Sequence, residues 1–488
     1  MSNMFDALES RVFLSAMPYS LYASEGYAGE GISEYVPMFN PNGMDVQYEV
    51  WAHFEVGERD LLLTSGTLRA GFRGGEVLSD AANPDASLVP TGRPYAVEIR
   101  STLPITADLT RYDRGQTGEA FTYDPSNSWV FPEVTLDGGI IEQYLTWFNT
   151  SDQQANVVVR VIDRTSIDEQ PAFSPVEVRV STDAMRRGGL SLSDVPALAG
   201  LTGTVSVEVI ADAPIVSMYA EYLGERGASL TLGSPSTGTN EAFFPVVFGP
   251  DSFSDSSQVS ITNTNGAPSE ITVTLRPTEG DAFQRSLTIG AGRSVTFGIS
   301  EILPQGAGSF TGSLTLRGFG FFHAQVTTGD LSTNGGKLAS STLTPGSLSR
   351  QFIAEGFMDP ARAGQDLFST FTLFVPPTPL LGGVSHLVIP FIGVTLHFGD
   401  GTSLELAELA SPGSHNLHEI DELLAHIGNN PNRRFFSIMV VSNIGAKTVL
   451  QHQDRFHTSF SGDLDSFFVQ GVDAQHINTI NFPPILPV

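Results

Sequence analysis

An all-β fold is predicted for this chain, made of tandem antiparallel β-sandwich domains with few short helices. Apolar residues alternate with polar ones in short runs, as at Val205, Val207 and Val209, and this period of two is typical of a strand with one buried face. The runs are rich in valine, isoleucine, threonine and phenylalanine, and clusters of glycine, proline and small polar residues separate them. Short strands of this kind indicate β-sandwiches or barrels.

A duplicated series of elements supports tandem domains. Each copy begins with a Phe-Pro pair, continues with a strand ending in Asn-Thr, and then has a third alternating run. These elements lie at 131–134, 146–150 and 157–161 in one copy and at 244–247, 261–264 and 271–275 in the other. Because the matched elements keep their order, they indicate duplicated domains.

The same pattern extends outward to four units of about one hundred residues, the usual size of a compact domain. Runs similar to 205–209 recur at 97–101, 314–317 and 438–441. The expected divisions are an N-terminal segment 1–20, four sandwiches 21–118, 119–235, 236–345 and 346–462, and a tail 463–488. Polar stretches at 114–128, 224–240 and 327–349 are expected to join the domains into an elongated rod.

Two short helical segments are expected, and both are interpreted as crossovers between strands of a sandwich. Ile420, Leu423 and Leu424 have the spacing of one helical face within 418–428. Ser193-Asp194, followed by Pro196, resembles the start of a short helix.

Composition and charge exclude several classes of function. The chain has no cysteine, so thiolate zinc sites are excluded and apolar burial must hold the sandwiches together. With 25 basic and 53 acidic residues, the formal net charge is -28, which opposes binding to nucleic acid and to anionic lipid surfaces. Such acidity is typical of proteins in saline surroundings. The alternative is an acidic protein whose charge has no relation to its environment. No apolar run approaches the roughly 20 residues of a membrane span.

The N-terminal sixteen residues read MSNMFDALESRVFLSA. They resemble the motif, LEPR followed by an apolar triplet, that opens many large exported proteins of certain bacteria, although Ser10 replaces its proline and Phe13 one of its leucines. The matching positions are Phe5, Ala7, Leu8, Glu9, Arg11, Leu14, Ser15 and Ala16. The resemblance implies an exported or cell-surface bacterial protein. A frayed amphipathic terminus is the alternative.

The repeated body also resembles tandem immunoglobulin-like sandwiches of bacterial surface proteins, in which a Phe-Pro strand precedes a strand with Asn-Thr. Phe131-Pro132 and Phe244-Pro245 carry this resemblance. In the first unit Val36-Pro37 takes the place of Phe-Pro, and in the fourth Phe352-Ile353 does. The resemblance implies an architecture more than an activity.

Another Phe-Pro strand opens near the C-terminus, where Phe482, Pro483 and Ile485 stand. Two interpretations are open. The strand closes the domain before it, or it is an orphan strand that adds to a neighbouring chain and produces self-association.

Histidines gather in the last quarter of the chain and supply the candidate metal ligands. His415, His418 and His426 fall near one helical face, with Glu419 or Asp421 to complete a site. The alternative is that these histidines are solvated or lie at the edge of a core.

Two other sets of residues are candidates for ligand binding. Trp51, Trp129 and Trp147 would stack on sugar rings if exposed, but Trp147 stands in a predicted core strand, which favours packing. Acidic turn residues would help to hold calcium, or they are ordinary turns; these residues are Asp113, Asp330 and Asp400.

The sequence contains no Gly-x-Ser-x-Gly elbow, no His-Glu-x-x-His and no phosphate loop. We therefore expect a non-enzymatic, exported bacterial surface protein without a cofactor: a spacer, an envelope-layer or filament subunit, or an adhesive stalk. The main alternative is a carbohydrate-binding adhesin that recognises surface glycans. A less favoured alternative is a hydrolase with its site in the fourth unit, at His415 and His418.

Overall fold

The fold is all-β, as predicted, with antiparallel pairing throughout the strands described. The computed structural model describes residues 17–81, 83–112, 116–137, 142–163, 174–222, 228–235, 237–249, 256–277, 281–304, 310–329, 337–340, 350–354, 356, 358, 369–375, 392–406, 413–416, 420–442, 449–456, 463–470 and 472–473. The two α-helices among them are α2 (Ile299–Ile302) and α3 (Asp421–Ile427).

The second unit shows the architecture that all four units share. Its first sheet contains β13 (Val176–Thr182), β12 (Ala155–Ile162), β15 (Thr202–Tyr222), β10 (Ser126–Asp137) and β17 (Ser234–Pro235). Its second sheet contains β14 (Arg187–Ser191), β11 (Glu142–Asn149), β15 again and β16 (Ala228–Leu232). The long strand β15 belongs to both sheets, because its first half pairs with β12 and its second half with β11.

The third unit repeats this strand order. Its first sheet contains β21 (Phe283–Ile289), β20 (Ser269–Pro277), β23 (Thr311–Gly329) and β18 (Thr239–Phe248). Its second sheet contains β22 (Ser294–Gly298), β19 (Ser256–Thr262), β23 again and β24 (Lys337–Ser340). The repeated sequence elements therefore occupy strands of the same order in the second and third units.

In the first and fourth units, two shorter strands replace the long shared strand. The first unit contains β1 (Tyr19–Ala23), β2 (Tyr27–Ala28), β3 (Ser33–Phe39), β4 (Val46–Phe54), β5 (Leu61–Leu68), β6 (Arg73–Ser79), β7 (Arg93–Ser101), β8 (Thr106–Tyr112) and β9 (Gln116–Ala120). The fourth contains β25 (Arg350–Ile353), β26 (Ser369–Val375), β27 (Ile392–Phe398), β28 (Ser403–Glu405), β29 (Gly413–Asn416), β30 (Phe436–Ser442), β31 (Val449–Phe456), β32 (Asp463–Gln470) and β33 (Val472–Asp473). Here β7 with β8, and β30 with β31, correspond to β15.

The short helical segments lie near their predicted places. Helix α3 starts at Asp421, with Ile420 at its N-cap position, and buries Leu423 and Ile427 against the fourth core. The predicted helix start at Ser193-Asp194 forms two 3-10 turns instead, at Leu192–Asp194 and Pro196–Leu198. Further 3-10 turns within the described residues span Pro84–Ala86 and Pro431–Arg433.

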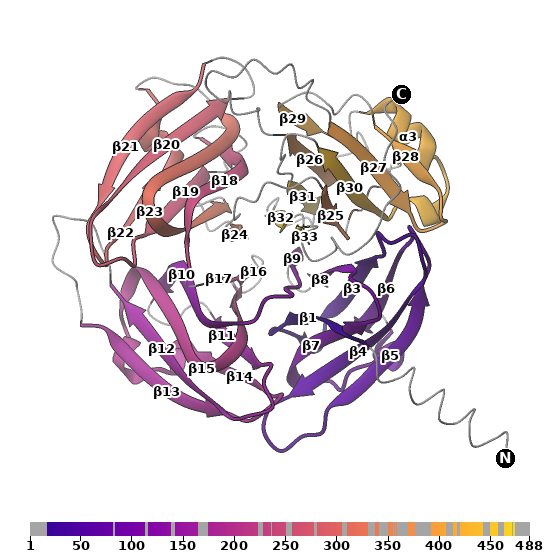
Figure 1. Ribbon diagram of the computed structural model, residues 1–488, viewed down its shortest axis with the longest axis horizontal. Coiled ribbons are helices and arrows are strands. Elements are labelled where there is room, and N and C mark those ends of the chain that lie inside the picture. The colour runs from indigo at the N-terminus through magenta and orange to yellow at the C-terminus, as the bar shows by residue number, and fades with distance from the viewer. Residues whose placement is uncertain are drawn as a thin grey trace.

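The four units form a closed ring in place of the predicted elongated rod (Figure 1). The opening strand of each unit packs against the second sheet of the next unit: β1 contacts β15, β10 contacts β23, and β18 contacts β26. The fourth unit closes the ring, because β25 contacts β8 of the first. Phe39, Phe352 and Ala354 form a buried cluster at this closure.

Short strands from the four units meet at the centre of the ring. β9 lies beside β16 and β32, and β24 lies beside the same two strands (Figure 1). This packing explains why no rod forms: the stretches predicted as free linkers contain β9, β16 and β17, which pair within sheets. The predicted boundary between 118 and 119 falls inside β9, and residues 463–470, predicted as tail, pair with β31.

A buried asparagine ends one strand of each of the first three units and fixes the turn that follows. Asn149 donates to the carbonyl oxygens of Gln153 at 2.7 Å, Thr182 at 3.2 Å and Asp183 at 3.0 Å. Asn40 and Asn263 make the same three kinds of bond from equivalent positions. A buried amide whose hydrogen bonds are satisfied stabilises the turn that follows it. The same set of hydrogen bonds occurs in all three units.

Candidate functional site

The candidate site is a pocket of about 480 Å³ where the first and second units meet. Its walls come from the ends of β2, β3, β4, β7 and β8 of the first unit and from β11, β14 and β15 of the second. Four carboxylates, two guanidinium groups and three tyrosine side chains line it. A volume of this size is typical of small-molecule sites.

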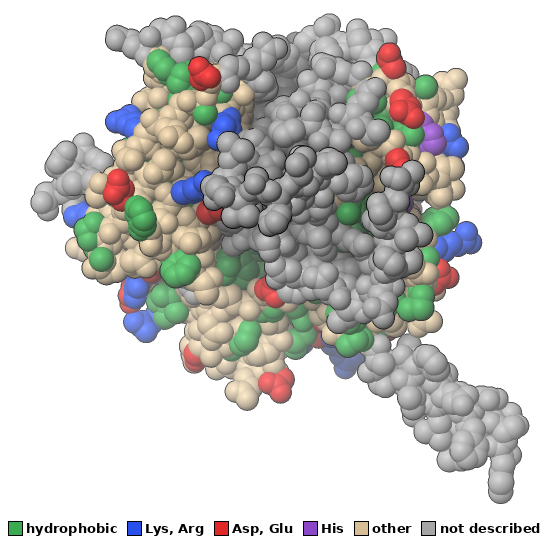
Figure 2. Space-filling view, turned by 45° about the horizontal axis from the view of Figure 1, so that its top comes forward, with side chains coloured by type: hydrophobic (Ala, Val, Ile, Leu, Met, Phe, Trp, Pro, Cys, Tyr) green, Lys and Arg blue, Asp and Glu red, His purple; other side chains and the backbone are tan. Residues whose placement is uncertain are grey.

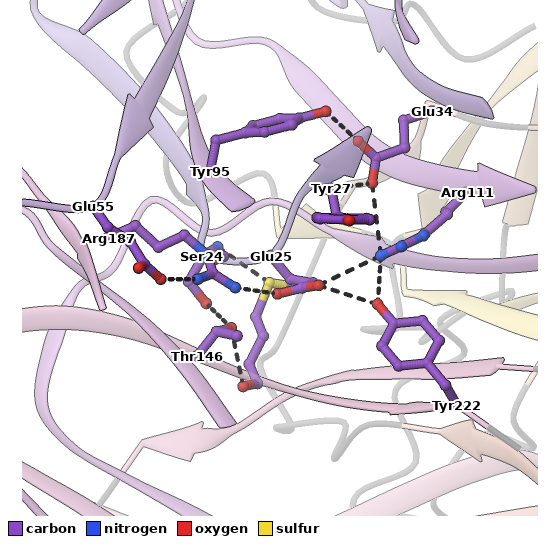
Figure 3. A network of polar contacts seen from close by, with 11 residues as sticks. Ser24, Glu25, Tyr27, Glu34, Glu55, Tyr95, Arg111, Thr146, Arg187 and Tyr222 are labelled. Carbon is purple, nitrogen blue, oxygen red and sulfur yellow. Dashed lines mark hydrogen bonds and ion pairs between the residues drawn. The ribbon is translucent and has the colours of Figure 1, made fainter. Parts of the chain in front are cut away.

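Glu25 lies at the floor of the pocket, in the turn between β1 and β2 (Figure 3). Its two carboxylate oxygens interact with Arg187 Nη2 at 2.8 Å and Arg111 Nη1 at 3.4 Å. The Tyr222 hydroxyl donates to the same carboxylate at 3.1 Å. The adjacent Gly26 is required for this turn, because a Cβ there would lie 2.5 Å from the Tyr95 ring.

Arg111 connects the floor to a second buried carboxylate behind it. Its Nη1 lies 3.8 Å from Glu34 Oε1, and Glu34 accepts hydrogen bonds from the Tyr95 hydroxyl and, at 3.0 Å, from the Tyr27 amide. Burial raises the pKa of Glu34, and the Arg111 charge and the hydrogen bonds oppose that rise only in part. Burial and the Glu34 charge also raise the pKa of Tyr95, so the phenol stays the donor of their hydrogen bond.

Arg187 joins the two units from the other side of Glu25 (Figure 3). It stands at the start of β14 and reaches back to the first unit, where it donates to Glu55 Oε1 at 2.8 Å and to the Ser24 carbonyl at 3.2 Å. The Ser24 and Thr146 hydroxyls complete this contact at 3.0 Å. A buried guanidinium with several acceptors is a strong geometric constraint, so it fixes the relative position of the units.

The upper part of the pocket is aromatic and acidic. The rings of Tyr144 and Tyr222 pack edge to face at 5.8 Å, and Tyr144 is 36% exposed. Glu30 and Glu142 are exposed lining residues on opposite units. Elsewhere on the molecule, hydrophobic, acidic and basic side chains are interspersed over the described part of the face shown in Figure 2.

The corresponding place between the second and third units has a different chemistry. Register places Glu133 at the position of Glu25, and its carboxylate accepts from the Ser260 hydroxyl at 2.9 Å. The position of Arg187 holds Ser294 there. The carboxylate therefore recurs without the guanidinium.

The second arginine of the pocket is replaced in the same way. Glu34 pairs across the sheet with Arg111, whereas the equivalent pair in the second unit is Gln143 with Glu221. Since these units join into the ring without arginines at those positions, ring packing alone does not require the arginine pair of the pocket.

A second buried polar cluster at the same unit boundary has a structural character. His53 Nε2 lies 2.9 Å from Glu98 and its Nδ1 lies 3.3 Å from Asp60, which also pairs with Arg186 of the second unit. Burial opposes ionisation of Glu98, but hydrogen bonds from His53 and Arg100 outweigh it and lower its pKa to about 2. This cluster stands apart from the lining of the pocket.

The predicted metal ligands do not form a site among the residues that the structure describes. His415 stands in β29, opposite Leu373, while His418 and Glu419 lie outside the described residues. The His426 ring packs on Phe398 with centroids 4.7 Å apart, and burial lowers its pKa.

The remaining candidates have structural partners or cannot be placed. Trp129 and Trp147 are buried in the second core, as predicted for Trp147, and the Arg100 guanidinium lies 5.1 Å from the Trp51 ring. Asp400 accepts hydrogen bonds from Thr402, Asn430 and Arg433, which hold its turn. The candidates outside the described residues are Asp113, Asp330, Phe482, Pro483 and Ile485.

Sequence reasoning missed the residues of the pocket. Glu25, Arg111 and Arg187 come from segments far apart in the chain and from two units. One signal was present for Arg111, which stands in a strand whose preceding residues are buried. Charged residues in such strands are rarely buried unless they are paired.

Among the described residues, none of the helices combines the length and apolar character needed to cross a bilayer. No protein-family profile matches the chain, and no curated protein is significantly similar to it. Several solved structures are similar in part, among them the following two. Thermotoga maritima 1070 is 19% identical over 23% of this chain and 96% of its own, with a TM-score of 0.20. A GH2 beta-galacturonidase from Eisenbergiella tayi bound to galacturonate is 10% identical over 63% of this chain and 45% of its own, with a TM-score of 0.17.

Proposed function

We propose that this chain is a non-enzymatic, exported bacterial protein whose pocket between the first and second units binds a carbohydrate. The observation that carries the proposal is the lining of that pocket, where tyrosine rings stand among carboxylates. The likeness of residues 1–16 to an export motif supports a location at the cell surface or outside the cell.

The pocket lining suits a polyhydroxylated ligand. Sugar hydroxyls donate to carboxylates and accept from tyrosine hydroxyls, and the faces of sugar rings pack on aromatic rings. Glu30 and Glu142 supply acceptors at the rim, Glu55 supplies one beside Arg187, and Tyr27 and Tyr144 supply rings. Glu25 supports a binding function over a hydrolytic one, because arginine and tyrosine side chains contact both of its carboxylate oxygens.

The closed ring favours a role in ligand recognition over a role as a spacer or stalk. A rod of sandwiches extends a partner away from a surface, whereas a ring returns its fourth unit to its first. Assembly into an envelope layer or filament through Phe482, Pro483 and Ile485 stays a separate proposal. Light scattering of the full chain beside one lacking residues 476–488 tests it, and a monomer in both cases would contradict it.

The binding proposal is tested with the full-length protein on a glycan array, followed by calorimetric titration of the glycans that bind. Tyr144→Ala removes an exposed ring of the pocket and is expected to weaken binding at least tenfold. The matched control is Tyr35→Ala, a tyrosine of β3 outside the pocket lining, which is expected to bind like the unaltered protein. Equal loss in both variants, or no glycan bound, would contradict the proposal.

A further inference from the structure

We propose that the ligand of this pocket carries a protonated amine, as a glycan with a free amino sugar does. The inference rests on the proposed carbohydrate-binding function and specifies the chemical class of the ligand. It follows from the charges of the pocket, from the way its arginines are used and from the position of its tyrosine rings.

The charges at the floor of the pocket offset one another. Glu25 and Glu55 both contact Arg187, and Glu25 also contacts Arg111. These two arginines are the cationic side chains of the lining, and Arg111 also lies 3.8 Å from Glu34 behind it, so carboxylates match both guanidinium groups. The floor therefore supplies polar contacts without a net positive charge.

The rest of the lining is acidic. Glu30 and Glu142 are exposed lining residues, and neither has a cationic partner among the lining residues. The field at Tyr144 has the same sign: its pKa is raised, first by burial and then by the carboxylates of Glu142, Asp194 and Glu25. A ligand group near Tyr144 thus meets an excess of negative charge, which favours a cation over a neutral or anionic group.

Tyrosine rings strengthen the preference for a cation. Tyr144 and Tyr222 present their rings to the same part of the pocket, at a centroid distance of 5.8 Å and an angle of 64°. This surface already accommodates one cation, because the Arg111 guanidinium lies 4.9 Å from the Tyr222 ring. An ammonium group over an aromatic face and beside carboxylates gains both cation–π and ion-pair attraction.

An anionic ligand is disfavoured by the way the arginines are used. Arg187 donates from Nε, Nη1 and Nη2 to Ser24, Glu55 and Glu25. To bind a carboxylate or phosphate, it would have to give up contacts that hold the two units together. The Arg187 donors are thus already occupied by protein acceptors, and Glu142 and Tyr144 are the residues that select the ligand.

The test compares two disaccharides with the full-length protein by calorimetric titration at pH 6 and physiological salt: the disaccharide of glucosamine and its N-acetylated counterpart. The free-amine sugar is expected to bind at least tenfold more tightly. Glu142→Gln is expected to reduce that ratio at least fivefold, while Glu270→Gln, which neutralises an exposed carboxylate of the third unit, leaves it unchanged. Tyr144→Ala is expected to weaken binding of the free-amine sugar, whereas Tyr144→Phe, which keeps the ring, retains it.

The outcomes separate the inference from the function on which it rests. Equal binding of both disaccharides, with weakening by Tyr144→Ala, would overturn the amine and leave a carbohydrate pocket. The free-amine sugar could bind more tightly, yet Glu270→Gln could reduce that preference as much as Glu142→Gln does. This result would show attraction to the overall negative charge of the protein and would overturn the inference. Binding of neither disaccharide, nor of any glycan on the array, would overturn both proposals.

Discussion

Replacing Glu119 tests the packing at the centre of the ring. Glu119 stands in β9 and is 2% exposed. Its carboxylate accepts from the Leu232 amide of β16 at 2.9 Å and from the Ala120 amide at 2.9 Å. Burial dominates these hydrogen bonds and raises the pKa of the carboxyl from 4.5 to about 7.

The raised pKa of Glu119 determines how the free energy of unfolding changes with pH. Between pH 4.5 and about 7, the folded protein holds a proton that the unfolded chain has released. The free energy of unfolding therefore falls as the pH rises through this range, and the loss is complete above pH 7. A shift of this size corresponds to about 3 kcal/mol.

Glu119→Gln removes the titrating group and keeps the shape of the protonated side chain. The unaltered protein is expected to lose several degrees of melting temperature between pH 5 and pH 8 that the variant retains. Scanning calorimetry of the full chain measures this, with Glu270→Gln as the exposed control. Parallel melting curves for the variant and the unaltered protein at both pH values would refute the reasoning.

Three further predictions concern stability and the closure of the ring. Asn149→Ala leaves three carbonyl groups without their donor and is expected to lower the free energy of unfolding by about 3 kcal/mol in a denaturant titration; a loss below about 1 kcal/mol would contradict it. Because the pKa of Glu98 is about 2 in the folded protein, about 3 kcal/mol is lost as the pH falls from 4.5 to 2; Glu98→Gln should abolish that acid sensitivity. Phe39→Asp places a charge in the closure cluster and should lengthen the maximum dimension in small-angle scattering; an unchanged scattering curve would show that this contact does not hold the ring.

The strands and their repetition were predictable because both depend on local patterns. Alternation in runs such as 205–209 sets one buried face, and the order of the runs recurs in the structure. One assignment was wrong. Val36-Pro37 was matched to the Phe-Pro strand, but it lies in β3, which corresponds to β11, and β1 is the true counterpart of β10. A Pro within a strand is compatible with either assignment, so only the pairing decides between them.

The ring was not predictable from these patterns. Closure depends on packing between β25 and β8, which lie far apart in the chain, and on short strands within segments that read as polar linkers. A linker and an edge strand of five residues have similar composition. The sequence therefore favoured a rod, since nothing local marks contacts between units.

The pocket was not predictable for a related reason. Its floor is a charge network assembled across two units, and each member alone reads as a solvated residue. The sequence instead indicated histidines and tryptophans as candidate site residues, because their chemistry is easily recognised in a sequence. Trp129 and Trp147 proved to be core residues, and His426 packs on Phe398.

The most direct test of the account is a titration of the full-length protein, labelled with carbon-13 in its tyrosine rings, with the glucosamine disaccharide. Of the 11 tyrosines, three line the pocket: Tyr27, Tyr144 and Tyr222. Saturable shifts are expected at these three signals alone, while Tyr48 and Tyr123, which lie outside the lining, are expected not to move. Shifts at tyrosines outside the pocket, or none at saturating disaccharide, would contradict it.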